Sequence, residues 1–262
     1  MDWIQIVILA LVQGITEFLP VSSSAHLVLP AQLTDWPDQG LAFDVGVHFG
    51  TLMAVILYFR QQLIAMATDV VTWPTHRTYT AHVDEVLKLG VATLPIVVVG
   101  FLAKDFVEAN LRSVLVIACT TSGFALLLWW ADRKPGQGEL ISWAHAGVIG
   151  LAQILALIPG TSRSGITITA ALLLGLSRTR AAEFSFLLAI PTIAGAQLLL
   201  TLDLVDGNMP ERWNELISGA LIAGISAYLC INLFISLVER SGMLPYVIYR
   251  LILGLALFWF VF

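Results

Sequence analysis

Charged residues are scarce in this chain. Asp, Glu, Lys and Arg together make up 12% of its 262 residues, whereas soluble domains carry roughly 25%. Hydrophobic residues reach 58% and the mean hydropathy is +0.87, which excludes a soluble domain and indicates an integral membrane protein. Lysine supplies only three of the thirteen basic residues. The sequence therefore has no basic stripe for nucleic acid and no polybasic patch for anionic lipid.

Cysteine is also rare, and the N-terminal segment has no basic residue. Cys119 and Cys230 each lie inside a long apolar run with no motif around them, which favours buried packing over a disulfide or a redox pair. No Lys or Arg precedes Arg60, so the N-terminus lacks the positive region of a signal peptide. We therefore expect its apolar segment to stay part of the membrane domain.

Long apolar runs are abundant. About 20 mostly apolar residues are needed to cross a bilayer as a helix. The pattern predicts an all-α integral membrane protein with six transmembrane helices, built as a single membrane domain over residues 1–262. The six stretches that reach or nearly reach the required length are Leu41–Phe59, Leu87–Ala103, Val114–Trp130, Ala181–Thr201, Leu216–Val238 and Leu244–Phe262.

Two further apolar regions, Trp3–Ala31 and Trp143–Leu176, are each interrupted near the middle by polar residues, at Pro20–Ser24 and at Pro159–Ser164. Proline ends one helix, and a following Ser or Thr caps the next. Each region is therefore predicted to form a re-entrant pair, in which a helix, a sharp loop and a second helix return the chain to the same face. The alternative is a proline-kinked span with an incidental polar patch. Irregular backbone at membrane depth must be buried in protein or line a cavity.

A weak internal repeat relates the two interrupted regions. The elements LVQ at Leu11–Gln13 and LAQ at Leu151–Gln153 each lead into a proline, and an acidic residue follows that proline by 24 positions, at Asp44 and at Glu183. Repeats with broken helices in matching places point to a midplane binding site between inverted halves. The predicted halves are approximately residues 1–103 and 114–238, followed by a C-terminal helix at 244–262.

Basic residues predict the orientation in the membrane. With a re-entrant first pair, nine of them fall on one side and three on the other. The positive-inside rule makes the side with nine cytoplasmic and puts both termini outside. The two polar loops then enter from opposite sides and meet near the midplane. The nine are Arg60, Arg77, Lys88, Arg133, Lys134, Arg178, Arg180, Arg240 and Arg250, and the three are Lys104, Arg112 and Arg212.

The two loops carry the chemistry of an anion site. Arg163 offers a bidentate fork for phosphate, and the helix that begins beside it offers free N–H groups. The first loop adds three serines and a second helix start. Phosphate makes the best use of so many short donors, although these residues leave carboxylate and chloride open as alternatives. The residues expected to bind substrate are Ser22, Ser24, Gly160, Thr161, Ser162, Ser164 and Thr167.

Glu17 needs its own explanation, because a carboxylate repels an anion unless a cation bridges them or it transfers a proton. Mg²⁺ and Ca²⁺ commonly bridge carboxylate and phosphate, so Glu17 predicts a divalent cation, with an amide oxygen from Gln13 on the same helical face. Ser23 and His26 would supply a nucleophile and a general acid or base, and the residues leave open which of the two attacks. The predicted catalytic residues are Glu17, Ser23, His26 and Arg163.

The motifs EFLPVSSSAH and PGTSRSGIT resemble the two signatures of the bacterial undecaprenyl-diphosphate phosphatase family, also called the bacitracin-resistance protein family. FDVGVHFGTL, AAEFSFLLAIP and PYVIYR extend the resemblance along essentially the whole chain. The resemblance implies hydrolysis of undecaprenyl diphosphate to the monophosphate, which recycles the lipid carrier of cell-wall synthesis. It also implies the bacterial cytoplasmic (inner) membrane, a site facing the periplasm and a required divalent cation. It carries over as site residues His26, Arg163, Ser22, Ser23, Ser162 and Ser164.

The chain departs from the family pattern at one position. Gln13 stands where some members have Glu, and Glu17 matches the second acid. The amide removes one of the two carboxylates that a fully acidic metal site would have.

Other polar residues receive simpler interpretations. His48 is expected to be a helix-interior histidine with a satisfied hydrogen bond, with a position facing the site as the alternative. Arg178 and Arg180 are expected to be interfacial charges. The expected partners are a polyprenyl diphosphate and membrane lipid, without nucleic acid, and a homodimer is kept as a candidate assembly. The rival function is a transporter or flippase that uses the same midplane site. A carrier has no need of a nucleophile and a base side by side, which favours an enzyme.

Overall fold

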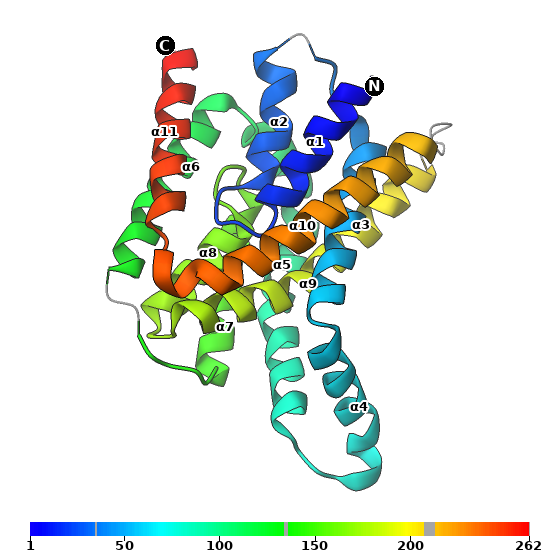
Figure 1. Cartoon of the computed structure of the whole chain (residues 1–262), viewed down its shortest axis with the longest axis vertical. Helices are drawn as coiled ribbons and strands as arrows, with labels where there is room; N and C mark the ends of the chain where they lie inside the picture. The colour runs from blue at the N-terminus through cyan, green and yellow to red at the C-terminus, as the bar shows by residue number, and fades with distance from the viewer. Residues whose placement is uncertain (35, 134–135, 207–212, 262) are drawn as a thin grey trace.

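The computed structural model describes residues 1–34, 36–133, 136–206 and 213–261. Within these ranges the chain forms eleven α-helices and one short 3₁₀ helix, η1, and no strand. Figure 1 shows their arrangement. The elements are α1 (Trp3–Thr16), α2 (Ser23–Leu33), α3 (Gly40–Tyr58), α4 (Arg60–His76), α5 (Ala81–Asn110), α6 (Val114–Asp132), α7 (Trp143–Gln153), η1 (Ile154–Leu157), α8 (Arg163–Leu173), α9 (Arg178–Asp206), α10 (Trp213–Ser241) and α11 (Leu244–Val261).

Six helices of the described ranges are long and apolar enough to cross a membrane: α3, α5, α6, α9, α10 and α11. Each overlaps one of the six predicted stretches. The prediction of an all-α, multi-pass membrane protein with six spans is therefore confirmed. Its basis is simple, because an apolar run of this length satisfies its backbone hydrogen bonds internally only as a helix.

The two interrupted regions fold as predicted at the level of helices and breaks. The chain leaves α1 at Glu17 and begins α2 at Ser23, and it leaves η1 after Leu157 and begins α8 at Arg163. α1 and α2 lie side by side in Figure 1, joined by the loop at their lower ends. Neither region therefore forms the continuous, proline-kinked helix of the alternative. That these pairs stop inside a bilayer, and that the halves are inverted repeats, stay predictions.

Both loops have a residue with positive φ immediately before the next helix. The N-cap residues Ser22 and Ser162 have φ of 76° and 71°, a left-handed region that is strained for a residue with a side chain. Ser162 accepts a hydrogen bond from the backbone N–H of Gly165 at 3.1 Å, so it caps α8 as expected. The predicted serine cap of α2 does not form, since Ser22 at the N-cap position makes no side-chain capping bond in the described structure.

The main hydrophobic core lies directly behind the loops. It brings together buried aromatic side chains from α9, α10 and the first loop, including Phe18, which packs edge-to-face on Phe186 with ring centroids 5.2 Å apart. Phe186 in turn contacts Phe234 at 5.5 Å. Because Phe18 follows Glu17 in the chain, this packing fixes the backbone that carries the carboxylate.

Glycines allow α3 and α10 to approach closely. A Cβ added to Gly50 on α3 would lie 2.0 Å from the carbonyl oxygen of Ala220 on α10, and one added to Gly14 on α1 would lie 2.4 Å from that of Ala223. Small residues at such contacts let helix backbones meet where the surrounding lipid provides no hydrophobic drive. The position of α10 against α1 and α3 therefore depends on these glycines.

Ion pairs collect at the end of the bundle away from the termini. Arg178 binds Asp132 at 2.6 Å, and Arg180 pairs with Glu85, so both arginines are engaged within the protein. At the same end, α4 and the start of α5 project from the bundle (Figure 1). Asp69 on α4 accepts hydrogen bonds from Thr80 and His82, which lower the pKa of its carboxyl group. The projection is thus tied together by a carboxylate that stays ionised at neutral pH.

Gly50→Ala should lower the free energy of unfolding by about 1–3 kcal/mol, because the added methyl group overpacks the contact with Ala220. Gly90→Ala is the matched control, since a Cβ there meets no atom within 4 Å and alanine favours the helix. Thermal unfolding of both variants in detergent checks this. Equal unfolding midpoints for the two variants would show that the close α3–α10 contact at Gly50 does not limit the stability of the protein.

Candidate active site

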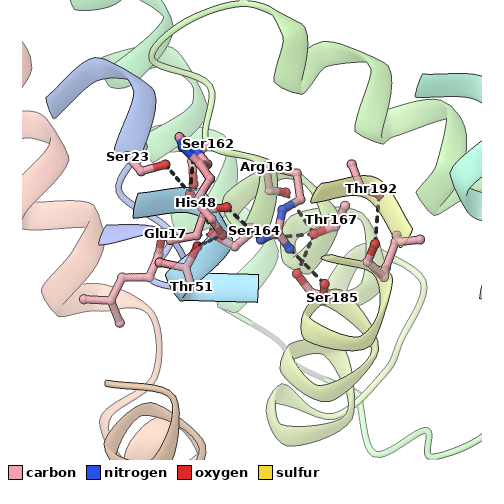
Figure 2. A network of polar contacts seen from close by, with 12 residues as sticks. Glu17, Ser23, His48, Thr51, Ser162, Arg163, Ser164, Thr167, Ser185 and Thr192 are labelled. Carbon is pink, nitrogen blue, oxygen red and sulfur yellow. Dashed lines mark hydrogen bonds and ion pairs between the residues drawn. The ribbon is translucent and has the colours of Figure 1, made fainter. Parts of the chain in front are cut away.

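A polar cavity of about 240 Å³ lies where the two loops meet. Its walls come from both interrupted regions and from the spans α3, α5 and α9. Figure 2 shows its polar contacts, with Glu17 between Ser23, His48 and Arg163. The polar residues that line the cavity are Glu17, Ser22, Ser23, Ser24, His48, Ser162, Arg163, Thr192 and Gln197.

Glu17 lies at the centre of the contacts in the cavity. One carboxylate oxygen, Oε1, accepts from Arg163 Nη2 at 3.3 Å. The other, Oε2, accepts from Ser23 Oγ at 2.6 Å and from Gln13 Nε2 at 3.0 Å. The side chain is only 8% exposed. A buried carboxylate is tolerable because a cation and two further donors compensate for its lost hydration.

Arg163 is held from the side opposite Glu17. Its Nη1 donates to the backbone carbonyl of Ser185 on α9 at 3.0 Å, and its guanidinium lies over the ring of Phe18 with 5.8 Å to the centroid. Ser185 Oγ in turn pairs with Thr167 Oγ1 at 2.7 Å. The guanidinium is therefore fixed in direction, and it joins the second loop to the first.

His48 on α3 also lines the cavity. Its Nδ1–H donates to the backbone carbonyl of Asp44 at 2.8 Å, and its Nε2 lies 3.9 Å from Glu17 Oε2. The expected internal hydrogen bond is present, and His48 also faces the site, which the sequence leaves open as the less favoured alternative. Nothing local in the sequence signals this, because the position depends on how α3 packs beside α1.

His26 occupies a different place from the other predicted catalytic residues. Its Nδ1–H donates to the carbonyl of Ser22 at 2.7 Å, and its Nε2 accepts from the hydroxyl of Tyr249 on α11 at 2.5 Å. The two rings are stacked, with centroids 5.6 Å apart. His26 is not among the residues that line the cavity. The group in contact with the Ser23 hydroxyl is Glu17, not His26.

Three of the seven residues expected to bind substrate line the cavity: Ser22, Ser24 and Ser162. The other four lie behind its wall and connect elements. Ser164 Oγ donates to the carbonyl of Leu19 at 2.9 Å, and Thr167 binds Ser185, as described above. The carbonyls of Gly160 and Thr161 face Arg250, while the buried Thr161 hydroxyl has no partner in the described structure.

Arg250 on α11 is fully buried and binds four backbone carbonyls. These belong to Pro20 at 3.3 Å, Gly160 at 2.8 Å, Thr161 at 3.0 Å and Thr121 at 3.2 Å. One guanidinium thus joins both loops to α6. Arg250, which the charge count places on the cytoplasmic side, is therefore buried inside the protein and is not an exposed interfacial charge. Only the tertiary structure identifies its role, because its partners lie between 89 and 230 residues away in the chain.

Comparison with known proteins identifies the family. The model of the family described as "Bacitracin resistance protein BacA" matches residues 6–256. The chain belongs to this family. Full-length relatives include the undecaprenyl-diphosphatases of Alcanivorax borkumensis, 56% identical over 99% of both chains, and of Alteromonas mediterranea, 53% identical over 100% of both. The undecaprenyl-diphosphatase 2 of Stutzerimonas stutzeri is 54% identical, covering 98% of this chain and 97% of that protein.

The oxygen donors of this family member fit a divalent cation only in part. No group of three or more His, Cys, Asp or Glu within the described ranges could hold a metal ion. Glu17 supplies one carboxylate, and Gln13 Oε1 is buried and has no partner among the residues that the structure describes. Because the O and N of an amide are interchangeable by a flip, this oxygen could face Glu17. The donors suit Mg²⁺ or Ca²⁺ completed by phosphate oxygens and water, not a closed protein cage.

Arg250→Met should lower the free energy of unfolding by roughly 3 kcal/mol or more, because each buried carbonyl left without a donor costs about 1–3 kcal/mol. Arg240→Met is the matched control, since Arg240 is exposed at the end of α10. Thermal unfolding in detergent provides the measurement. If the two variants unfold alike, Arg250 does not hold the loops together.

Proposed function

We propose that this protein hydrolyses undecaprenyl diphosphate to undecaprenyl phosphate and inorganic phosphate, and so recycles the lipid carrier of peptidoglycan synthesis. Family membership and full-length relatives with that name support the reaction. The observation that carries the proposal is the joint placement of Glu17, Ser23 and Arg163 in one buried cavity.

In this proposal the phosphates bind between the two loops. Arg163 keeps its bond to Ser185 and donates from its other nitrogens to phosphate oxygens. These oxygens replace Glu17 as partners of the guanidinium group. The N-termini of α2 and α8 adjoin the same cavity, since Ser23, Ser24 and Arg163 line it. Their N–H groups and dipoles favour an anion there. In this proposal the groups that attract the anion are mainly the backbone N–H groups of the two helix N-termini and the guanidinium of Arg163.

Ser23 is the nucleophile in this proposal, and Glu17 is its base. Ser23 Oγ already donates to Glu17 Oε2 at 2.6 Å, so its proton passes to Glu17 as Oγ bonds to the terminal phosphorus. The bridging P–O bond breaks, and undecaprenyl phosphate leaves. Water then attacks the phosphorus of the phosphoserine, the Oγ–P bond breaks, inorganic phosphate leaves, and Oγ takes back the proton from Glu17. Arg163 stabilises the charge that develops on the transferred phosphoryl group.

The further polar residues position these groups. His26 fixes the carbonyl of Ser22 immediately before Ser23, and His48 flanks the carboxylate of Glu17. A divalent cation, Mg²⁺ or Ca²⁺, would be held by Glu17 and the amide oxygen of Gln13 and would neutralise phosphate charge when bound. This role for the cation is part of the proposal.

We further propose that the protein resides in the bacterial inner membrane with its site open to the periplasm and both termini outside. The termini share one end of the bundle in Figure 1, opposite α4. The start of α9 lies beside the end of α10, since Arg178 contacts Glu239, and beside the start of α5, which follows α4, since Arg180 pairs with Glu85. Arginines near these ends, with Arg60 and Arg77 flanking α4, support a cytoplasmic assignment of that end by the positive-inside rule.

Phosphate release from undecaprenyl diphosphate by the purified protein tests the reaction. Glu17→Gln and Arg163→Ala should each lower kcat/KM by about 10²–10⁴, because they remove the base and the main phosphoryl ligand. Glu139→Gln, at an exposed position, should leave the rate unchanged. Wild-type protein that binds the substrate without releasing phosphate would favour a carrier, which a flipping assay would then examine.

The metal proposal has a separate test. Chelator should abolish phosphate release, and Mg²⁺ or Ca²⁺ should restore it. Gln13→Glu adds a second carboxylate and should lower the metal concentration needed for half-maximal rate, whereas Gln13→Leu should raise it. Calorimetric titration with the metal alone should rank the variants in the same order. Full activity in chelator would remove the cation from the mechanism.

A further inference from the structure

A second cavity, larger and apolar, runs along the outer face of α3, α9 and α10. Its volume is about 720 Å³, within the range of roughly 300–1,000 Å³ found for ligand pockets. None of the described residues that line it is charged. Its walls are made mainly by Phe49, Met53, Leu57, Leu221, Ile225 and Leu229.

The floor of this groove is made by residues with little or no side chain. Gly46, Gly50 and Gly224 all line it, and a Cβ on Gly224 would lie 3.1 Å from the carbonyl oxygen of Gly50. Because α3 and α10 approach closely at these glycines, their larger side chains lie on either side of the groove floor. The groove is therefore a consequence of the helix packing, and its shape suits a long, unbranched or methyl-branched chain.

The groove and the polar cavity share one lining residue, Gln197 on α9. This side chain is 8% exposed. Its Nε2 donates to the carbonyl of Val45 on α3 at 2.7 Å, while its Oε1 is buried and has no partner in the described structure. An unsatisfied buried acceptor needs explanation, and at this junction it marks where a polar compartment gives way to an apolar one.

We propose that the groove holds the isoprene units nearest the diphosphate of the lipid substrate, which pass Gln197 as they leave the polar cavity. This inference rests on the proposed phosphatase function. A substrate with an anionic head and an apolar tail needs a polar site with an apolar exit, and Gln197 joins two such compartments. Neither a membrane phospholipid nor a second copy of the chain accounts for that junction, because neither needs access to the polar cavity.

The expected contribution of the groove is orientation. Lipid or detergent around the protein solvates the tail as well as the groove does, so binding there adds little affinity from burial. A tail fixed beside the reacting group instead restricts how the diphosphate sits, and small errors in that geometry reduce rates strongly. Changes to the groove should therefore affect kcat/KM for long-chain substrates more than for short ones.

A substitution that fills the groove tests this. Leu221→Trp, at a position 61% exposed in the groove wall, should lower kcat/KM for undecaprenyl diphosphate about tenfold and leave isopentenyl diphosphate unchanged. Leu102→Trp is the matched control, since Leu102 is 77% exposed on α5 and does not line the groove. An unchanged ratio of long-chain to short-chain rates in Leu221→Trp would overturn the inference.

A crosslinking experiment locates the tail directly. A polyprenyl diphosphate with a diazirine on its second isoprene unit should label α3 and α10 at Phe49, Met53 or Leu221. Labels confined to other lipid-facing helices would overturn the proposal, as would a Leu221→Trp variant that changes only the oligomeric state. Wild-type protein that hydrolyses none of these diphosphates would instead overturn the proposed function, so the two failures are distinguishable.

Discussion

Irregular backbone buried in an apolar bundle must have its polar groups satisfied by the protein itself, and this constraint governs the whole structure. Both loops present carbonyls that no helix can satisfy, and Arg250 binds those of Pro20, Gly160 and Thr161. Ser164 adds a bond to the carbonyl of Leu19. The same contacts that satisfy the backbone also hold the loops at a fixed separation. The alignment of the polar cavity depends on them.

The pair of Glu17 and Arg163 depends on that alignment and serves a different purpose. A buried ion pair is weak evidence for stability, because desolvation offsets much of the Coulomb attraction. Here each group compensates the charge of the other, and in the proposed mechanism phosphate would take the place of Glu17 as a partner of Arg163. The bonds from Arg163 to Ser185 and from Ser23 to Glu17 remain available to keep both side chains in place.

The two loops reach one cavity by similar routes with different details. In both, a serine with left-handed backbone begins the next helix, and its hydroxyl lies 3.3 Å from that of the serine two residues later. Only Ser162 also caps its helix; Ser22 instead offers its carbonyl to His26. The second loop is thus fixed by its own cap and by Arg250, whereas the first relies on α11 through Tyr249 and Arg250. Arg250 thus holds both loops, and the loop that carries Ser23 and Glu17 has no helix cap of its own in the described structure.

Helix number, helix breaks and the residue types of the loops follow from local causes. An apolar run must be helical in a membrane. Pro20 and Pro159 each break the helix in their own region within a few residues of the proline. Glu17, Ser23 and Arg163 could be recognised because polar groups in such runs need a reason. Other placements could not be predicted from the sequence: those of His48 and Gln197 in cavity walls, of His26 against Tyr249 and of Arg250 between the loops. Those contacts join distant parts of the chain, and they exist only once glycine-mediated packing has set where each helix lies.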